Sequence, residues 1–324
     1  MNPLYVGLEL GAGGFFVLAA VAAARRGRLP LLELLSAAMF GILLEEGDQL
    51  IFGSYHYAAD WILKLDRAPI AIGLTWALIL AGAMRITDAL GVQRRYAPFV
   101  DALLAISLDL AFDAIAIRIG LWTWRGVPSN EGWFGVPAGN FYAWLFVALG
   151  FSLVTRWLRV PATRRPRLAW LQLLAPIPAY AILIGGLTPF IVLKPMVDQT
   201  HGGGLSLFGV ALVAFTVQAG RGMLIAEREA AHAADRAMLD LRMAFLSRLA
   251  IHAFFLAALL VLGLATREPV LLAAAVALLA AELPLAWLVR ARTTRAPLMR
   301  GAEAKPVPQT AADGARPETA GTWP

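Results

Sequence analysis

The chain has 324 residues, of which 59% are hydrophobic and 15% are charged, with a formal net charge of +6 and a mean hydropathy of +0.67. Soluble globular chains average roughly 45–50% apolar and about 25% charged residues, so this composition predicts an integral membrane protein. The lack of cysteine excludes disulfides, iron–sulfur clusters and thiol nucleophiles, and four scattered histidines argue against a di-iron site built from clustered imidazoles.

Nine apolar runs follow one another along the chain, and each is long enough to cross a hydrocarbon core of roughly 30 Å. They cover approximately residues 4–24, 30–52, 68–90, 97–120, 139–158, 168–193, 205–226, 245–265 and 269–289. The last stretch is rich in Ala, Pro, Thr and Gly and lacks apolar periodicity, which is typical of disorder. We therefore expect an all-α, polytopic transmembrane helical bundle over residues 1–292 and a disordered cytoplasmic tail over residues 293–324.

Positive charge predicts the orientation of these spans. If the N-terminus lies outside, the inner loops hold 19 Lys and Arg residues, the outer loops hold six, and Arg316 lies apart in the tail. Cytoplasmic loops of membrane proteins carry an excess of basic residues. We therefore expect a protein of the cytoplasmic membrane with its N-terminus outside the cell and its C-terminus in the cytoplasm. The net charge of +6 then reports membrane orientation and contact with lipid, and we expect no nucleic-acid partner.

Acidic residues lie inside three of the predicted spans. At roughly 1.5 Å of rise per helical residue, five carboxylates fall in the outer half of the membrane: Glu9, Glu45, Glu46, Asp109 and Asp113. Asp109 and Asp113 share one helix face, and Arg118 is the nearest candidate counter-charge. A single acid in a span could serve only to hold two helices together, since an interhelical polar bond contributes about 0.6–2 kcal/mol. Because the acids outnumber the cations at this depth, the group as a whole indicates a functional site.

Aromatic residues and turns accompany these acids in a characteristic order. In chain order, the first motifs are Glu45, Gly53-Ser-Tyr55-His-Tyr57 and Pro69 with Trp76. Asp109-Leu-Ala-Phe-Asp113, Gly120-Leu-Trp122-Thr-Trp124 and Gly135-Val-Pro137 with Asn140-Phe141 and Trp144 follow them. Over residues 43–151 this order resembles the carotenoid biosynthesis family of multi-span membrane proteins, whose characterised members are carotenoid hydratases. Two departures bear on substrate identity. Ala114 stands where many members carry proline, and no Thr-Gly-x-Pro precedes the Phe-Gly.

The resemblance implies the hydration of the terminal double bond of an acyclic carotenoid, without metal or other cofactor. Protonation of the less substituted alkene carbon gives a tertiary cation, which water captures. We expect Asp113 to be the acid and Asp109 its partner, while Glu45 or Glu46 positions water or stabilises the cation. The expected substrate-binding residues are Tyr55, His56, Tyr57, Trp76, Trp122, Trp124, Asn140 and Trp144. The expected partners are the lipophilic carotenoid, membrane lipid and other carotenoid-pathway enzymes.

Other function classes stay open. Asp109-x-x-x-Asp113 matches half of an aspartate-rich diphosphate site, as in an isoprenoid transferase, although no inner-face loop carries a second acidic motif to bind Mg²⁺. The prolines and glycines of run 168–193 indicate a kinked or broken helix, which is typical of transporters. A transporter fold often has an internal repeat, and none is apparent here. A non-catalytic pigment-binding role also fits an aromatic-lined pocket.

Overall fold

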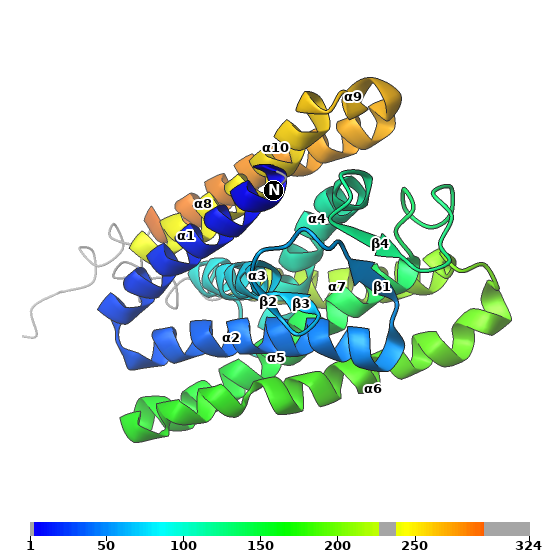
Figure 1. The fold of residues 1–324 in the computed structure, drawn as a ribbon. Helices are drawn as coiled ribbons and strands as arrows, with labels where there is room; N and C mark the ends of the chain where they lie inside the picture. Colours follow the sequence, from blue (N-terminus) through cyan, green and yellow to red (C-terminus); the bar gives the residue numbers. More distant parts are fainter. Residues whose placement is uncertain (1–2, 227–237, 295–324) are drawn as a thin grey trace, which may run out of the picture.

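The computed structural model describes residues 3–226 and 238–294, and over them the chain forms long helices and two short strand pairs (Figure 1). The helices are α1 (Pro3–Arg26), α2 (Arg28–Gly47), α3 (Ile70–Ala89), α4 (Ala97–Arg118), α5 (Ala138–Arg164), α6 (Pro176–Val197), α7 (Leu205–Leu224), α8 (Met238–Val261), α9 (Leu264–Arg267) and α10 (Pro269–Thr294). A π-helical turn η1 (Asp48–Phe52) and a 3₁₀ segment η2 (Pro166–Leu174) interrupt them. The strands are β1 (Tyr55–Tyr57), β2 (Lys64–Leu65), β3 (Ala68–Pro69) and β4 (Trp122–Trp124).

Seven of the described helices are long and apolar enough to cross a membrane: α1, α3, α5, α6, α7, α8 and α10. The prediction of an all-α polytopic protein is therefore confirmed. Helices α2 and α4 coincide with two further predicted spans and have 20 and 22 residues, but acidic side chains along them lower their apolar character. The count of nine spans and their orientation stay predictions. The predicted tail lies, from residue 295 on, outside the described residues.

The helices pack so that four of them form a central group. Figure 1 shows α1, α8 and α10 on one side of the bundle and α6 on the opposite side, with α2, α3, α4 and α5 between them. Helix α3 contacts α1, α2, α4 and α8, whereas α5 contacts α4, α6 and α7. Helix α6 continues through Pro189, and the irregularity expected in run 168–193 lies before it, in the 3₁₀ segment η2.

Helices α2 and α3 approach closely because glycines face each other across their contact. A Cβ added to Gly41 would lie 2.5 Å from Cβ of Trp76, and one added to Gly73 would collide with Ile42. Small residues let membrane helices bring their backbones together. This contact brings Trp76 against Gly41 of α2, nearly two turns before that helix ends at Gly47.

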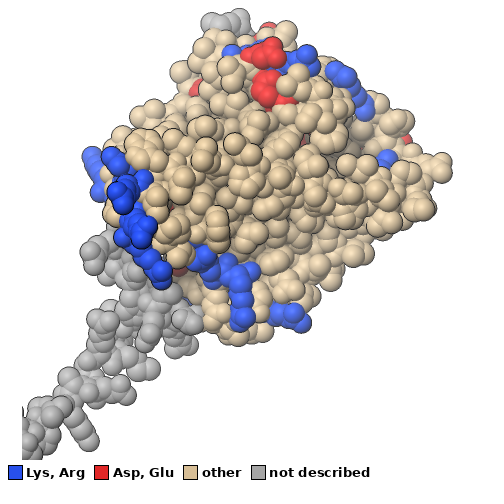
Figure 2. Space-filling model, turned by 90° about the horizontal axis from the view of Figure 1, so that it is seen from below, with Lys and Arg blue, Asp and Glu red and all other residues tan. Residues whose placement is uncertain are grey.

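Basic residues gather at one end of the bundle. Figure 2 shows them along the edge next to the grey residues, while the broad face in view is nearly free of charge. This edge, called the basic end below, includes the exposed arginines at the ends of α1 and α5, the start of α2 and the α3–α4 loop: Arg25, Arg26, Arg28, Arg94, Arg95, Arg164, Arg165 and Arg167. It is the end that the distribution of positive charge predicts to be cytoplasmic.

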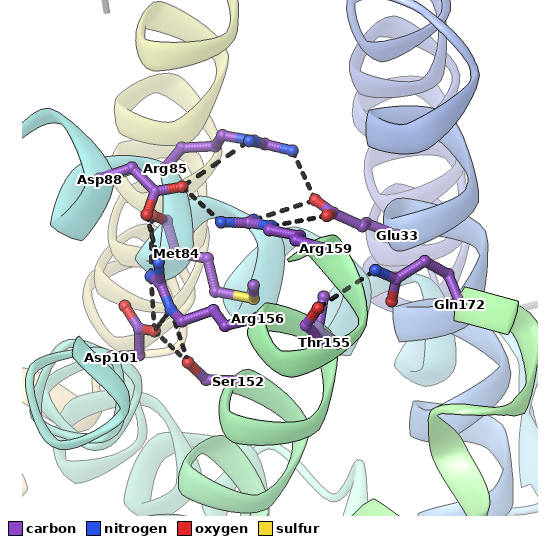
Figure 3. Close-up of polar contacts among 10 residues, drawn as sticks. All are labelled: Glu33, Met84, Arg85, Asp88, Asp101, Ser152, Thr155, Arg156, Arg159 and Gln172. Atoms are coloured by element: carbon purple, nitrogen blue, oxygen red, sulfur yellow. Dashed lines mark hydrogen bonds and ion pairs between the residues drawn. The ribbon is translucent and has the colours of Figure 1, made fainter. Parts of the chain in front are cut away.

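Just inside the basic end, a network of ion pairs joins α2, α3, α4 and α5 (Figure 3). Glu33 of α2 accepts hydrogen bonds from Arg85 at 2.9 Å and from Arg159 at 2.6 and 2.9 Å. Asp88 pairs with Arg159 at 2.9 Å and also with Arg156. Each acid in this network faces at least one guanidinium group, which compensates its charge.

Arg156 of this network and Arg248, which lies outside it, also donate hydrogen bonds to polar groups on α4. Arg156 of α5 donates to Asp101 of α4 at 2.9 Å, and Asp101 also accepts from Ser152 at 2.5 Å. Arg248 of α8 forms a separate group of hydrogen bonds that joins α8, α10 and α4 and is called the Arg248 lock below. It donates to Glu282 of α10 at 2.6 Å and, on α4, to the Leu104 carbonyl oxygen at 2.8 Å and to the hydroxyl of Ser107 at 2.9 Å.

Candidate functional site

A cavity of about 600 Å³ lies in the other half of the bundle, near the paired strands β1 and β4. Three buried carboxylates line it: Glu45 of α2, and Asp109 and Asp113 of α4, which are 5%, 1% and 1% exposed. The two aspartates face the same cavity because helical residues four positions apart share a face. The remaining wall is mostly aromatic and aliphatic, so the carboxylates are set in an apolar surrounding.

Strand β1 places two phenols over Glu45. After α2, the turn η1 and Gly53, whose φ of 56° suits glycine, bend the chain back along the helix end. Tyr55 and Tyr57 lie on one side of β1, as alternate strand residues do, and both donate to Oε2 of Glu45, Tyr57 at 2.5 Å. Trp76 donates from Nε1 to Oε1 at 2.6 Å. Burial and the Glu45 carboxylate raise the pKa of both tyrosines, so they act as neutral donors.

One amide bridges the aspartate pair. Asn140, in the first turn of α5, donates from Nδ2 to Oδ2 of Asp113 at 2.7 Å and to Oδ2 of Asp109 at 2.9 Å. Trp122 of β4 donates from Nε1 to Oδ1 of Asp113 at 2.7 Å. Oδ1 of Asp109 is buried and has no hydrogen-bond partner among the described residues. The two aspartates are therefore unequal, because Asp113 accepts two N–H groups and Asp109 accepts one.

Arg118 does not compensate these acids, so the expectation of an Arg118 counter-charge was wrong. Its Nε donates to Glu268 at 3.0 Å, and Nη1 donates to the carbonyl oxygens of Ala114 and Phe134 at 2.9 and 2.7 Å. Five residues correspond to roughly 140° of helix rotation, at about 3.6 residues per turn, so Arg118 points to a different side of α4 from Asp113. The hydrogen-bond donors to the cavity carboxylates come from neutral side chains.

Most residues that the sequence proposed for the site line this one cavity. With the three carboxylates these are Tyr55, Tyr57, Trp76, Trp122, Trp124, Asn140 and Trp144. The indole rings of Trp76 and Trp144 are tilted against each other, with centroids 4.0 Å apart and an interplanar angle of 34°. Six aromatic side chains from α3, α5 and the β1–β4 pair thus line the cavity together with Glu45 and the aspartates.

Glu46 and His56 lie away from the cavity. Glu46 accepts hydrogen bonds from the backbone N–H groups of Arg67 and Ala68 at 2.9 and 2.7 Å, which fixes the β2–β3 hairpin. His56 is exposed opposite Thr123 on the outer side of the β1–β4 pair. A shift of one residue turns a helical side chain by 100° and sends a strand side chain to the other face, which explains both positions. The fifth predicted acid, Glu9, accepts from the N–H of Ile62 at 2.6 Å.

The cavity also has walls that the sequence did not indicate. Helices α1 and α8 contribute Gly7, Gly11, Ile251 and Phe254, and polar groups at another part of the wall are Asp48, Arg125, Lys194 and His201. A spacing of four between two glycines of α1 was visible in the sequence, but nothing in it showed which helices meet. Within residues 3–226 and 238–294, no three His, Asp or Glu side chains are grouped to hold a metal ion.

Comparison with known proteins identifies a family whose sequence pattern covers most of the segments that form this cavity. The model of a family described as carotenoid biosynthesis protein matches residues 12–196, more than half of the chain. The matched segment contains α2 to α5, both strand pairs and all three cavity carboxylates. Neither a curated protein nor a solved structure matches the chain.

Proposed function

This chain belongs to the carotenoid biosynthesis protein family, and from that premise we propose that it adds water to the terminal double bond of an acyclic carotenoid. A role in carotenoid biosynthesis follows from the family, and the membrane-spanning helices suit a lipophilic substrate. The single observation that carries the finer proposal is the set of three buried carboxylates that share an aromatic cavity and accept hydrogen bonds from neutral donors.

Hydration of an alkene requires a proton donor and a group that accepts a proton from water. The hydrogen bonds divide these roles between the two aspartates. Asp113 accepts two N–H groups, an arrangement that suits a carboxylate, whereas Oδ1 of Asp109 is free to carry a proton. The sequence favoured Asp113 as the acid, but the structure supports Asp109 as the donor and Asp113 as the acceptor.

In the proposed reaction, Asp109 transfers its proton to the less substituted alkene carbon. The π electrons form the new C–H bond and leave a tertiary cation at the neighbouring carbon. A water molecule adds through its oxygen and gives one proton to Asp113, which yields a tertiary alcohol. Proton transfer from Asp113 to Asp109, which share the Asn140 amide, resets the site. General acid catalysis of this kind contributes roughly 10²–10⁴ in rate.

Glu45 and the indoles supply stabilisation for the cation. Tyr55, Tyr57 and Trp76 hold the Glu45 side chain in place, so a negative charge is already oriented when positive charge develops. The face of an indole also attracts a cation, at about 0.5–2 kcal/mol. Trp76 and Trp144 line the cavity together with the carboxylates, so their indole rings are the proposed source of this attraction.

The test is expression of the chain in cells that make lycopene, followed by pigment analysis in water enriched in heavy oxygen. We expect a new hydroxylated carotenoid that carries label from water. Label from molecular oxygen would contradict hydration, and prenyl elongation would indicate a transferase. If unmodified carotenoid copurifies with the protein and no product forms, the result favours pigment binding and contradicts the enzymatic role.

A further inference from the structure

The cavity extends from the carboxylates towards two opposite sides of the bundle. On one side its wall is formed by α1, α3 and α8, and on the other by α6 and the segment after β4. Figure 1 shows α1 with α8 on one side of the central helices and α6 on the other, so the cavity passes across the bundle. The part between α1, α3 and α8 is called the α1 arm below.

The α1 arm is lined by hydrocarbon. Its side includes Leu8, Phe15, Ile79, Ile251 and Phe254. The only hydroxyl groups among the lining residues of these three helices, within the described part of the chain, belong to Thr75 and Ser247. Each donates to a carbonyl oxygen of its own helix, at 2.8 and 3.0 Å. The arm therefore offers no unsatisfied hydrogen-bonding group and suits an apolar chain.

The opposite arm is polar at its end. Arg125, Lys194 and His201 line it, together with Asp48. Burying a charged group against hydrocarbon without a compensating partner is costly, so a polyene is disfavoured there and water is favoured. The two arms thus differ in the molecules that they can hold, with the carboxylates between them.

Glycines keep the α1 arm open. Residues 7, 8, 11, 12 and 15 of α1 all line the cavity and share one helix face. A Cβ added to Gly11 would meet no atom within 4 Å, and one added to Gly7 would meet only the ring of Phe254, at 3.9 Å. The glycines leave space here and do not serve close helix packing. Gly7 is exposed at the surface of the bundle, so the arm reaches the lipid-facing side.

We propose that the α1 arm is the binding site of the polyene chain, with the terminal double bond at Asp109 and the rest of the carotenoid leaving past Gly7 into lipid. This assignment rests on the proposed function for the identity of the ligand. Asp109 lines the same cavity, and its buried Oδ1 has no hydrogen-bond partner among the described residues, so this residue marks the reactive end. Water reaches the cation from the polar arm.

The test compares Gly11→Leu with Gly14→Leu. Both glycines have open space around an added Cβ, but Gly14 is exposed and does not line the cavity. Leucine favours helix over glycine, so both variants are expected to fold. Because the added side chain occupies the arm, Gly11→Leu should lower lycopene turnover and the lycopene-to-protein ratio on purification by about tenfold or more. Gly14→Leu should leave both within about twofold of the parent, since a surface substitution rarely matters.

A second substrate separates blocking of the arm from damage to the site. Myrcene has the same dimethyl end group on a short chain, so Gly11→Leu should lower its turnover much less than that of lycopene. If the parent hydrates lycopene and Gly11→Leu matches Gly14→Leu in both measurements, the arm assignment is overturned. If the parent binds lycopene but forms no alcohol, the proposed function fails, and the copurification ratio of the two variants still decides where the polyene lies.

Discussion

Two regions of the molecule that hold buried carboxylates surround them with different partners. The basic-end network holds Glu33, Asp88 and Asp101, and the cavity holds Glu45, Asp109 and Asp113. In the first region every acid faces an arginine from a neighbouring helix. In the second, indole, phenol and amide groups of neutral side chains donate the hydrogen bonds.

This difference indicates what each region does. An acid paired with a guanidinium group is compensated, and such pairs hold helices in register. An acid supplied only with neutral donors keeps its capacity to exchange a proton or to stabilise a positive charge. Helices α2, α3, α4 and α5 contribute to both regions, yet of the two only the cavity leaves room for a ligand of the size of a terpenoid end group.

The difference between the two regions is tested most directly by the same substitution, aspartate to asparagine, in each of them. Asp109→Asn should reduce turnover by about 10²–10⁴, because the amide keeps the shape of the side chain but delivers no proton. Asp101→Asn, at the basic end, should leave the turnover of folded protein near that of the parent. Product formation per folded protein in detergent measures both. Full activity in Asp109→Asn together with loss of activity in Asp113→Asn would reverse the two roles.

Arg156→Met should have the largest effect on stability. It leaves Asp101 buried and Asp88 half-buried with one fewer positive charge between them. Breaking a buried pair costs about 3–5 kcal/mol, and the partial exposure of Asp88 puts this case at the lower end. Thermal unfolding in detergent, followed by circular dichroism, measures the loss. Adding Asp101→Asn should restore part of it, and no recovery would mean that packing, not charge, dominates.

Removal of one neutral donor in the cavity should have an intermediate effect. Trp122→Phe takes one N–H group away from Asp113, and hydrogen bonds to charged groups are worth about 1.5–3 kcal/mol, or roughly 10–100-fold in turnover. The matched control is Trp133→Phe, since Trp133 donates to the Leu110 carbonyl oxygen at 3.0 Å and does not line the cavity. Equal losses in both variants would show that the Trp122 contact matters only for packing.

Glu46→Gln should have the smallest effect. The amide oxygen still accepts the hydrogen bonds from Arg67 and Ala68, so stability should change by at most about 0.5 kcal/mol. Turnover should stay near that of the parent, whereas Glu45→Gln at the neighbouring position should lower it clearly. The ratio of initial rates for the two variants measures this. A larger loss in Glu46→Gln than in Glu45→Gln would restore Glu46 to the site and remove Glu45.

Part of the site could be predicted because buried charge is visible in a sequence. Acids within apolar runs stand out, and the spacing of Asp109 and Asp113 fixes a shared face. The shared face of Asp109 and Asp113 was therefore predictable. The direction of each helix face relative to its neighbours was not, which is why Glu46 was included and Gly11 was missed. Arg118 was assigned by proximity along the chain, while its actual partner, Glu268, lies 150 positions away.

The basic-end network could not be predicted for the same reason. Arg156 and Arg159 looked like ordinary basic residues at the cytoplasmic end of a span. Their partners come from three other helices, and one of these contacts joins residues 126 positions apart. Such pairing depends on the arrangement of the bundle, which neither hydropathy nor residue spacing specifies. The helical class, by contrast, depends on local composition and was predictable.

The Arg248 lock has a consequence for the biogenesis of the protein. Leu104 and Arg248 are 144 positions apart, so the ribosome has made all of α4 well before it makes the arginine that binds the Leu104 carbonyl oxygen. Until then, the helix that carries Asp109 and Asp113 lacks one of its anchors. The family match ends at residue 196, and yet the final placement of this helix awaits residues translated after it. A nascent chain released before α8 would carry the whole matched segment without a finished cavity.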